Sequence, residues 1–270
     1  MNTGLTASAA PGKRTPWQIQ RAVLFALLQR DLKARFGGRW LGGLWTLFEP
    51  LAHVIILMLL FGYLRHRVVP GIPFPLFLVT GLIPYLMFRN LTLRLMSALD
   101  GSRGLFGYRQ VKAIDVLVAR AGMEVLIYSV LFVVFLVALG WTDFQWFPDR
   151  PLHLAVASAV LIAFGFGLGL LLAVLTDDLP QLRVFVRLIF MPLYFVSGVI
   201  FPLHSLPAEF LPWLLWNPLL HLIEIHRGDF VENYRVIEQV NLSYPAALAL
   251  VTLALSLALY RVRRRQLLAR

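Results

Sequence analysis

The sequence predicts an all-α membrane protein with six transmembrane helices, an N-terminal cytoplasmic interface helix, and a periplasmic re-entrant hairpin between spans five and six. Of its 270 residues, 59% are hydrophobic and only 14% are charged, a balance typical of chains that cross a bilayer repeatedly. Apolar windows recur six times, and a helix of about 20 residues crosses a hydrocarbon core of roughly 30 Å. Two further apolar pieces after the fifth window are too short to cross, which predicts the hairpin.

The N-terminal segment divides into two parts. Residues 1–16 are polar and small and predict a flexible cytoplasmic N-terminus, without the apolar core of a cleaved signal peptide. Residues 17–40 predict an amphipathic interface helix, since apolar side chains recur about every four residues, at Trp17, Leu24, Leu28, Leu32 and Phe36. The i,i+4 spacing of Asp31 and Arg35 predicts that they neutralise each other. Two roles remain open for this helix: a membrane anchor, or an entry point for substrate at the lipid surface.

The membrane domain is predicted to cover residues 41–262. Its six spans are expected at about 44–64, 75–97, 116–139, 152–175, 184–201 and 244–262. Basic residues gather before the first span, between the second and third, at the start of the fifth, and in the tail 263–270. The positive-inside rule therefore places these segments and both termini in the cytoplasm. The opposite segments mix basic residues, including Arg227, with acids such as Glu224 and Asp229.

The predicted re-entrant hairpin covers residues 203–230. Its two apolar pieces, 206–216 and 219–225, are each too short to cross a bilayer. A broken element at membrane depth is tolerated only where it is buried in protein or lines a water-filled cavity, which favours a transport path. The residues assigned to the hairpin are Pro207, Trp213, Trp216, Asn217 and Pro218. A seventh span over residues 206–228 is the alternative, and it would leave the basic C-terminal run outside.

Several function classes find no support in the residues. There is no GxxxxGK[ST] phosphate loop, no HExxH pair and no GxSxG elbow, so we expect no catalytic residue and no nucleotide hydrolysis by this chain. The absence of cysteine removes thiol chemistry and cysteine metal sites, and the scattered histidines predict no metal site. The formal net charge of +11 resides at span ends rather than on a separate soluble fold, so no nucleic-acid partner is expected.

Charged and aromatic residues within or beside the spans are the candidates for a substrate or lipid path. Arg89 lies well inside the second span, where a charge is costly unless it faces protein, water or an anion. Mid-span aromatic rings present flat amphipathic faces that can stack on sugars, although ordinary packing is the simpler explanation for each one. The path residues predicted in this way are Arg30, Lys33, Arg35, Arg39, Phe48, Tyr85, Phe88, Arg89, Arg94 and Tyr194. Arg120 and Glu124, one turn apart, are expected to neutralise each other within the third span.

Two glycine-containing segments receive different interpretations. Gly165, Gly167 and Gly169 lie mid-span, without a preceding strand, and predict close helix packing rather than a phosphate cradle. The cytoplasmic loop 100–115, DGSRGLFGYRQVKAID, places an apolar cluster among glycines and basic residues. A solvated linker does not need such a cluster, so the loop predicts a docking site for a partner protein.

The chain resembles the permease subunits of ATP-binding-cassette capsular polysaccharide exporters. The resemblance rests on ARFGGRWLGGLWTLFEPLAH at residues 34–53, TGLIPYLMFRN in the second span, YRQVKAIDVLVAR at residues 108–120, and FMPLYFVSGVIFPLHSLP with LLWNPLLHLIEIHRGDF near the hairpin. Arg109 and Ala113 stand where the family pattern has proline. The resemblance implies a bacterial inner-membrane homodimer bound to two copies of a separate ATPase, which binds ATP and Mg. It also implies a coupling helix in the loop, involving Ser102, Arg103, Gly104, Leu105, Phe106, Gly107, Tyr108 and Arg109.

The implied substrate is a lipid-linked, usually acidic capsular polysaccharide, with periplasmic adaptor and outer-membrane export proteins as further partners. Alternatives remain: export of another lipid-linked glycan such as an O antigen or teichoic acid, export of a lipophilic drug, or a membrane glycosyl or phosphoglycosyl transferase. A drug pathway would be narrower and lack aromatic and arginine lining. A transferase would need a convergent cluster of carboxylates and a base at one membrane face, whereas the acids here are dispersed. A non-transporting scaffold would have no use for Arg89.

Overall fold

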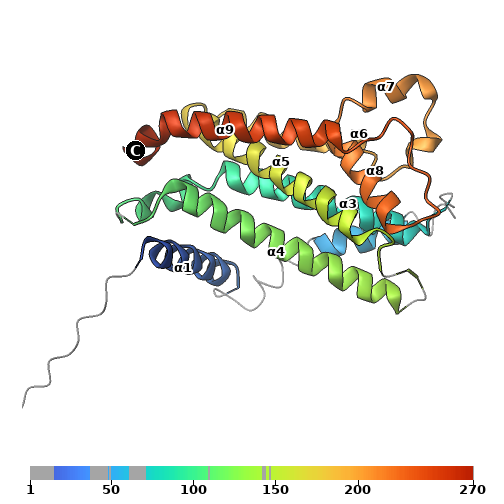
Figure 1. Cartoon of the computed structure of the whole chain (residues 1–270), viewed down its shortest axis with the longest axis horizontal. Coiled ribbons are helices and arrows are strands. Elements are labelled where there is room, and N and C mark those ends of the chain that lie inside the picture. The colour runs from blue at the N-terminus through green and yellow to red at the C-terminus, as the bar shows by residue number, and fades with distance from the viewer. Residues whose placement is uncertain are drawn as a thin grey trace, which may run out of the picture.

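The computed structural model describes residues 15–36, 48, 50–60, 71–108, 110–141, 144–145 and 147–269, without the side chains of residues 265, 268 and 269. Within these ranges the regular elements are helices. Four of them, α3 (Phe74–Met96), α4 (Ala113–Gly140), α5 (Pro151–Asp178) and α9 (Ser243–Ala269), are long and apolar enough to cross a membrane. They lie side by side as an elongated bundle (Figure 1). These helices correspond to the second, third, fourth and sixth predicted spans.

Helix α5 lies between α3 and α9, its two most extensive neighbours. Its glycines allow this close approach, because a Cβ at Gly169 would lie 2.8 Å from the Cβ of Leu95 on α3. On another side of α5, a Cβ at Gly167 would lie 2.9 Å from the backbone nitrogen of Leu253 on α9. The prediction that these glycines serve helix packing is confirmed.

The fifth predicted span is shorter than expected. Helix α6 (Leu182–Val196) has 15 residues, which at 1.5 Å per residue gives about 22 Å, less than a bilayer core of about 30 Å. It ends because Gly198 adopts a φ of +68°, a left-handed conformation that glycine adopts without strain. The prediction of one continuous helix over 184–201 is therefore wrong at its C-terminal end. For the first predicted span, the structure describes Phe48 and the apolar helix Pro50–Leu60, and the rest lies outside the described residues.

Beyond α6 the chain forms three short elements and one longer helix. Two 3-10 turns, η2 (Leu203–Ser205) and η3 (Ala208–Phe210), lead into the single-turn α7 (Leu211–Leu214). Helix α8 (Pro218–Phe230) then packs against α5 and α3. Eleven of its 13 residues are buried, so it is an internal element although its sequence carries five charged or histidine residues. The predicted break at Asn217-Pro218 is confirmed as the start of α8.

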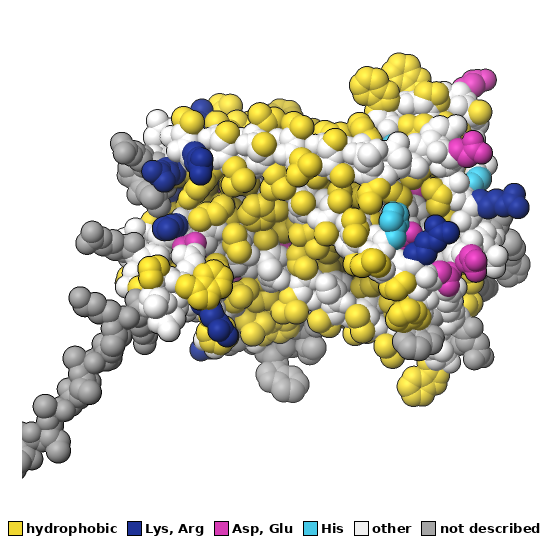
Figure 2. All heavy atoms as spheres, in the orientation of Figure 1, with side chains coloured by type: hydrophobic (Ala, Val, Ile, Leu, Met, Phe, Trp, Pro, Cys, Tyr) yellow, Lys and Arg dark blue, Asp and Glu magenta, His cyan; other side chains and the backbone are white. Residues whose placement is uncertain are grey.

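The two ends of the bundle differ. One end holds α1 (Pro16–Phe36), the 3-10 helix η1 (Asp100–Leu105) and the C-terminal end of α9, and the other holds α7 and α8 (Figure 1). Hydrophobic side chains cover the middle of the face in Figure 2, whereas the charged side chains lie toward the ends. A transverse apolar band of this kind is what a bilayer-embedded bundle presents.

The predicted apolar stripe of α1 describes only part of how this helix packs, since Leu24 and Leu28 are half-buried against the core. Trp17 is 76% exposed and Leu32 is 44% exposed, whereas Leu27 and Asp31 are buried. The face toward the bundle is thus offset from the predicted stripe, because α1 packs on α4 partly through buried polar contacts. The exposed apolar residues remain available to contact lipid.

Candidate functional site

The loop around η1 is held to the bundle by ion pairs. The Asp100 carboxylate lies 2.6 Å from the Arg183 guanidinium at the start of α6. Arg103 contacts Asp100 at 3.1 Å and Asp177, near the end of α5, at 3.2 Å. Ser102 is buried and accepts a hydrogen bond from Arg30 of α1 at 3.3 Å. The loop is therefore connected to α1, α5 and α6.

The apolar residues of this loop differ in accessibility. Tyr108 is 66% exposed, and Gly104 and Gly107 are exposed as well. Leu105 and Phe106, expected as exposed docking residues, are half-buried against a core cluster to which α1, α3, α4, α5 and α9 contribute. Arg109 lies outside the described residues. Of the predicted apolar docking residues, Tyr108 is thus the one that protrudes.

The predicted pairs within α1 and within α4 are wrong, because all four residues pair between helices. Asp31 contacts Arg120 of α4 at 3.5 Å and its neighbour Arg30 at 3.0 Å. Arg35 of α1 pairs with Glu124 of α4, which is 1% exposed. A buried carboxylate is costly unless a cation neutralises it. Here the neutralising arginine comes from the neighbouring helix rather than from the residue four positions away on the same helix.

Glu124 also links a third helix. Arg94 of α3 lies 3.0 Å from the Glu124 carboxylate and is 45% exposed, so this predicted path residue takes part in structural pairing. Near the other end of α1, the Gln20 amide donates to Asp115 at 2.5 Å. Polar contacts thus fasten α1 along α4. Lys33, also predicted for the path, is exposed, and Arg39 lies outside the described residues.

The aromatic path residues are packed against each other and their neighbours. Tyr85 is 1% exposed, donates a hydrogen bond to the carbonyl oxygen of Phe190, and has its ring centre 5.1 Å from that of Tyr194. Phe88 is also 1% exposed and stacks on Phe164 with ring centres 5.2 Å apart. Tyr85 and Phe88 therefore cannot contact a substrate in this conformation. Phe48 is different, since it is 54% exposed.

Arg89 is half-buried on α3. Among the described residues, no carboxylate forms an ion pair with it, in contrast to Arg94 five residues later. An arginine without a counter-ion inside an apolar helix is costly. Among the described path residues, Arg89 is thus the half-buried cation that needs a partner from outside the described part of the chain.

The segment before α8 combines a half-buried helix cap with exposed aromatics. Trp213 and Trp216 are each 80% exposed and belong to the projecting region near α7, which is Trp-rich as at membrane–water interfaces (Figure 1). Asn217 caps α8, because its side-chain oxygen accepts from the backbone nitrogen of Leu219 at 3.0 Å. Its amide donates to Ser197 at 2.9 Å. Pro207 is exposed, and Pro218 occupies the first turn of α8.

A fully buried ion pair lies at the centre of α8. Glu224 and Arg227 are both 0% exposed, and a carboxylate oxygen of Glu224 lies 2.8 Å from Nη1 of Arg227. Nη1 also donates to the carbonyl of Gly198 and Nη2 donates to that of Val199, each at 2.9 Å. The Arg227 guanidinium therefore binds the turn that ends α6.

Neighbouring groups complete the environment of this pair. The Arg227 guanidinium carbon lies 3.6 Å above the ring centre of Phe77 on α3. Gly81 leaves the space that the guanidinium fills, since a Cβ there would lie 2.4 Å from Nη2. The Tyr234 hydroxyl donates to both Glu224 oxygens at 3.0 and 2.9 Å. Burial and the adjacent Glu224 carboxylate raise the pKa of Tyr234, which keeps the phenol protonated as a donor.

This pair is what sequence reasoning missed. From the sequence, Glu224 and Arg227 counted only as charges of the outer segments, and the structure places both inside the bundle as an ion pair. The signal that could have found them is the ExxR spacing within the apolar run LLHLIEIHRGDF, which puts both charges on one helical face among residues that avoid water. Within the described residues, no group of three or more His, Asp or Glu is arranged to hold a metal ion.

Comparisons with known proteins identify the family. Residues 22–231 match the family described as ABC-2 type transporter. The chain is 40% identical over 256 residues to the polysialic acid transport protein KpsM of Escherichia coli, covering 94% of this chain and 98% of the relative. It is 29% identical to the capsule polysaccharide export inner-membrane protein CtrC of Neisseria meningitidis serogroup B, covering 89% and 91% of the two chains. It is 28% identical to the capsule polysaccharide export inner-membrane protein BexB of Haemophilus influenzae, covering 88% and 90%. The chain belongs to the ABC-2 type transporter family.

Proposed function

We propose that this chain is the membrane permease subunit of an ABC exporter that moves a lipid-linked, acidic capsular polysaccharide from cytoplasm to periplasm. The observation that carries the proposal is the 40% identity to a polysialic acid transport protein along nearly the whole of both chains. Similarity to two inner-membrane capsule export proteins supports the same substrate class and location. Periplasmic adaptor and outer-membrane export proteins are the further partners of such a route.

The energy source is a separate ATPase that binds ATP and Mg. Support comes from the absence of a phosphate-binding loop in the sequence and from the shape of the η1 loop. Tyr108 protrudes as a docking residue, while Asp100 and Arg103 connect the loop to α5 and α6. A displacement of the loop by the ATPase would thus be transmitted directly to the start of α6 through Arg183.

The active assembly is a homodimer with its path between the permease halves. Helix α6 supports this, because Phe190 is its one buried residue and three of its large side chains, Phe185, Leu188 and Met191, are 62% to 72% exposed. A helix with so little packing inside its own chain has a face free for a second copy. Half-buried Arg89 would then meet the anionic polymer or lipid head in the path.

The membrane arrangement has six spans and both termini in the cytoplasm. In this arrangement the segment 44–64 and α6 are the two spans beyond the four long helices, and the α7–α8 segment is the re-entrant hairpin. Its supports are the 13-residue length of α8, too short to cross, and the contact of Arg227 with Gly198. In this arrangement the hairpin enters the membrane from the outer side and contacts the end of α6. Helix α6 can therefore be shorter than the bilayer core.

Deletion of the gene in its natural host tests the function. Surface polysaccharide should disappear while lipid-linked polymer accumulates inside the cell, as measured by polymer-specific staining of intact and permeabilised cells. Unchanged surface polymer would contradict the proposal, and accumulation of a different glycan would reassign the substrate.

Arg89→Ala tests the path within the same strain. We expect export to fall by more than protein abundance, because the substitution removes a charge that pairs with no described carboxylate. Arg89→Lys, which keeps the charge, should retain more export, and Arg235→Ala at an exposed outer position is the control. Wild-type export by Arg89→Ala would make Arg89 a structural residue only.

A further inference from the structure

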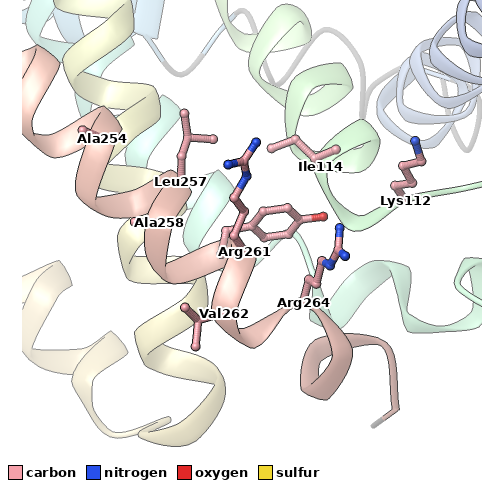
Figure 3. Close-up of a pocket in the computed structure, with 9 residues that line it drawn as sticks. Lys112, Ile114, Ala254, Leu257, Ala258, Arg261, Val262 and Arg264 are labelled. Atoms are coloured by element: carbon pink, nitrogen blue, oxygen red, sulfur yellow. The ribbon is translucent and has the colours of Figure 1, made fainter.

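A groove lies between α9 and the N-terminal end of α4, and the proposed function makes no use of it. Its volume is about 1050 Å³, and α9 contributes most of its lining. Figure 3 shows Arg261 and Arg264 reaching from α9 toward Lys112 and Ile114 at the start of α4. The groove is thus a basic hollow at the end of a membrane-crossing helix.

The three cations of the groove are uncompensated within the described part of the chain. Lys112, Arg261 and Arg264 are exposed, and none forms an ion pair with a described residue. The nearby Asp115 carboxylate is engaged elsewhere, since it accepts from Gln20 at 2.5 Å and from the backbone nitrogen of Lys112 at 3.0 Å. The groove therefore carries a net positive charge that an anion can neutralise.

The walls of the groove show what kind of anion fits. Ala254 and Ala258, one turn apart on α9, have small side chains that leave the hollow open, and Leu257 is 43% exposed beside them. These residues lie inside the apolar span, whereas Arg261 and Arg264 mark its end. A soluble protein partner could reach the charges but not the part of the wall at acyl-chain depth. A molecule with a charged head and an apolar tail can contact both.

We propose that this groove binds an anionic diacyl phospholipid of the surrounding bilayer. Lys112, Arg261 and Arg264 hold its phosphate, and the apolar face around Ala254 and Ala258 contacts its glycerol backbone and upper acyl chains. Basic pockets beside membrane helices bind anionic lipid heads by this combination of charge and apolar contact. The bound lipid fills the space between α4 and α9, which pack against each other only lightly.

The test uses the full chain together with its associated ATPase. The complex is purified from a host that makes no capsular polysaccharide, and retained phosphatidylglycerol is counted by native mass spectrometry. It is then titrated with phosphatidylglycerol or phosphatidylcholine. Wild type should retain and prefer phosphatidylglycerol. Equal affinity for the two lipids would overturn the proposal.

Two substitution types separate charge from shape. Arg261→Gln and Arg264→Gln should each weaken phosphatidylglycerol binding about fivefold, the effect of one basic residue at a lipid surface. Ala258→Leu leaves the charges in place and fills the hollow, so it should weaken binding of both lipids. The matched control is Arg263→Gln, because Arg263 lies on the same turn but pairs with Asp178 outside the groove. An equal loss in this control would refute the site.

The choice of host distinguishes a bilayer lipid from the exported substrate. A bilayer phospholipid should be retained to the same extent whether or not the host synthesises polysaccharide. If a lipid is retained only where the polymer is made, and phosphatidylglycerol does not bind in the titration, the groove holds the lipid end of the substrate and the proposal fails. The proposed export function would remain intact in that case.

Discussion

The guanidinium of Arg227 donates to the carbonyl oxygen of Gly198 at 2.9 Å, so the end of α6 is fastened to the middle of α8. Gly198 occupies a left-handed turn, and its carbonyl points into the bundle rather than to solvent. The same guanidinium neutralises Glu224, and therefore one side chain both satisfies the turn and balances the buried acid. If α6 moves relative to α8, this hydrogen bond must break, unless the Arg227 side chain moves with α6.

Removing the Arg227 charge should destabilise the protein strongly. Arg227→Met leaves Glu224 buried without a cation and two carbonyl groups without donors, at a cost of about 3 to 5 kcal/mol. The matched control, Arg235→Met at an exposed position, should change stability by less than about 0.5 kcal/mol. Thermal unfolding of the purified proteins in detergent measures both. Equal midpoints for the two variants would show that the buried pair is not needed for stability.

Neutralising Glu124 should loosen α1 from the bundle. Glu124→Gln removes the charge that Arg35 and Arg94 share, and we expect a loss of about 2 kcal/mol. Limited trypsin digestion should then cleave within α1 at lower protease concentrations than in wild type. Glu209→Gln, at an exposed site near α7, serves as control. Unchanged cleavage of α1 in Glu124→Gln would mean that apolar contacts alone hold this helix.

A charge at Tyr108 should prevent association with the ATPase. Tyr108→Glu places a carboxylate on the most exposed apolar residue of the η1 loop, and co-purification of the ATPase should fall about tenfold or more. Trp216→Glu, at an exposed aromatic residue at the other end of the bundle, should leave co-purification of the ATPase unchanged. Tyr108 is a cleaner site than Phe106, because half-buried Phe106 packs against the core and its substitution also disturbs folding. Normal recovery of the ATPase with Tyr108→Glu would remove the docking assignment.

Cysteine labelling tests the orientation, since the chain has no cysteine of its own. His204→Cys should react with an impermeant maleimide in intact spheroplasts, and Gly104→Cys should react only after permeabilisation. Gly104 suits this purpose because it is exposed and a Cβ there meets no atom within 4 Å, whereas Ser102 is 2% exposed. The opposite labelling pattern would invert the proposed topology.

The predictions from sequence succeeded for features that depend on the residues of a single helix, such as its existence and its first residue. Helices α3, α4, α5 and α9 follow from apolar length alone, and the start of α8 follows from Asn217-Pro218, because Asn is favoured at the N-cap and Pro at the first helical position. The length of α6 was overestimated, because apolar character continues through Gly198 while the backbone turns there. Apolar content therefore predicts burial better than it predicts where a helix ends.

The predictions about charge pairs failed for a physical reason. An i,i+4 pair within a helix contributes only about 0.2 to 0.5 kcal/mol, so contacts between packed helices readily replace it. Asp31 therefore pairs with Arg120, and Glu124 pairs with Arg35, although each has an oppositely charged residue one turn away on its own helix. The sequence of one helix does not by itself reveal which other helix packs against it.

By itself, the sequence determined that this chain is a helical membrane protein with basic span ends, a broken apolar segment near its C-terminal third, and the motifs of its transporter family. Only the tertiary structure decided that Glu224 and Arg227 are buried together, that Arg89 is left without a described counter-ion, and that Lys112 meets Arg261 and Arg264 across a groove. The reason is that apolar length is a property of one segment, whereas a charge acquires its environment from helices distant in the chain.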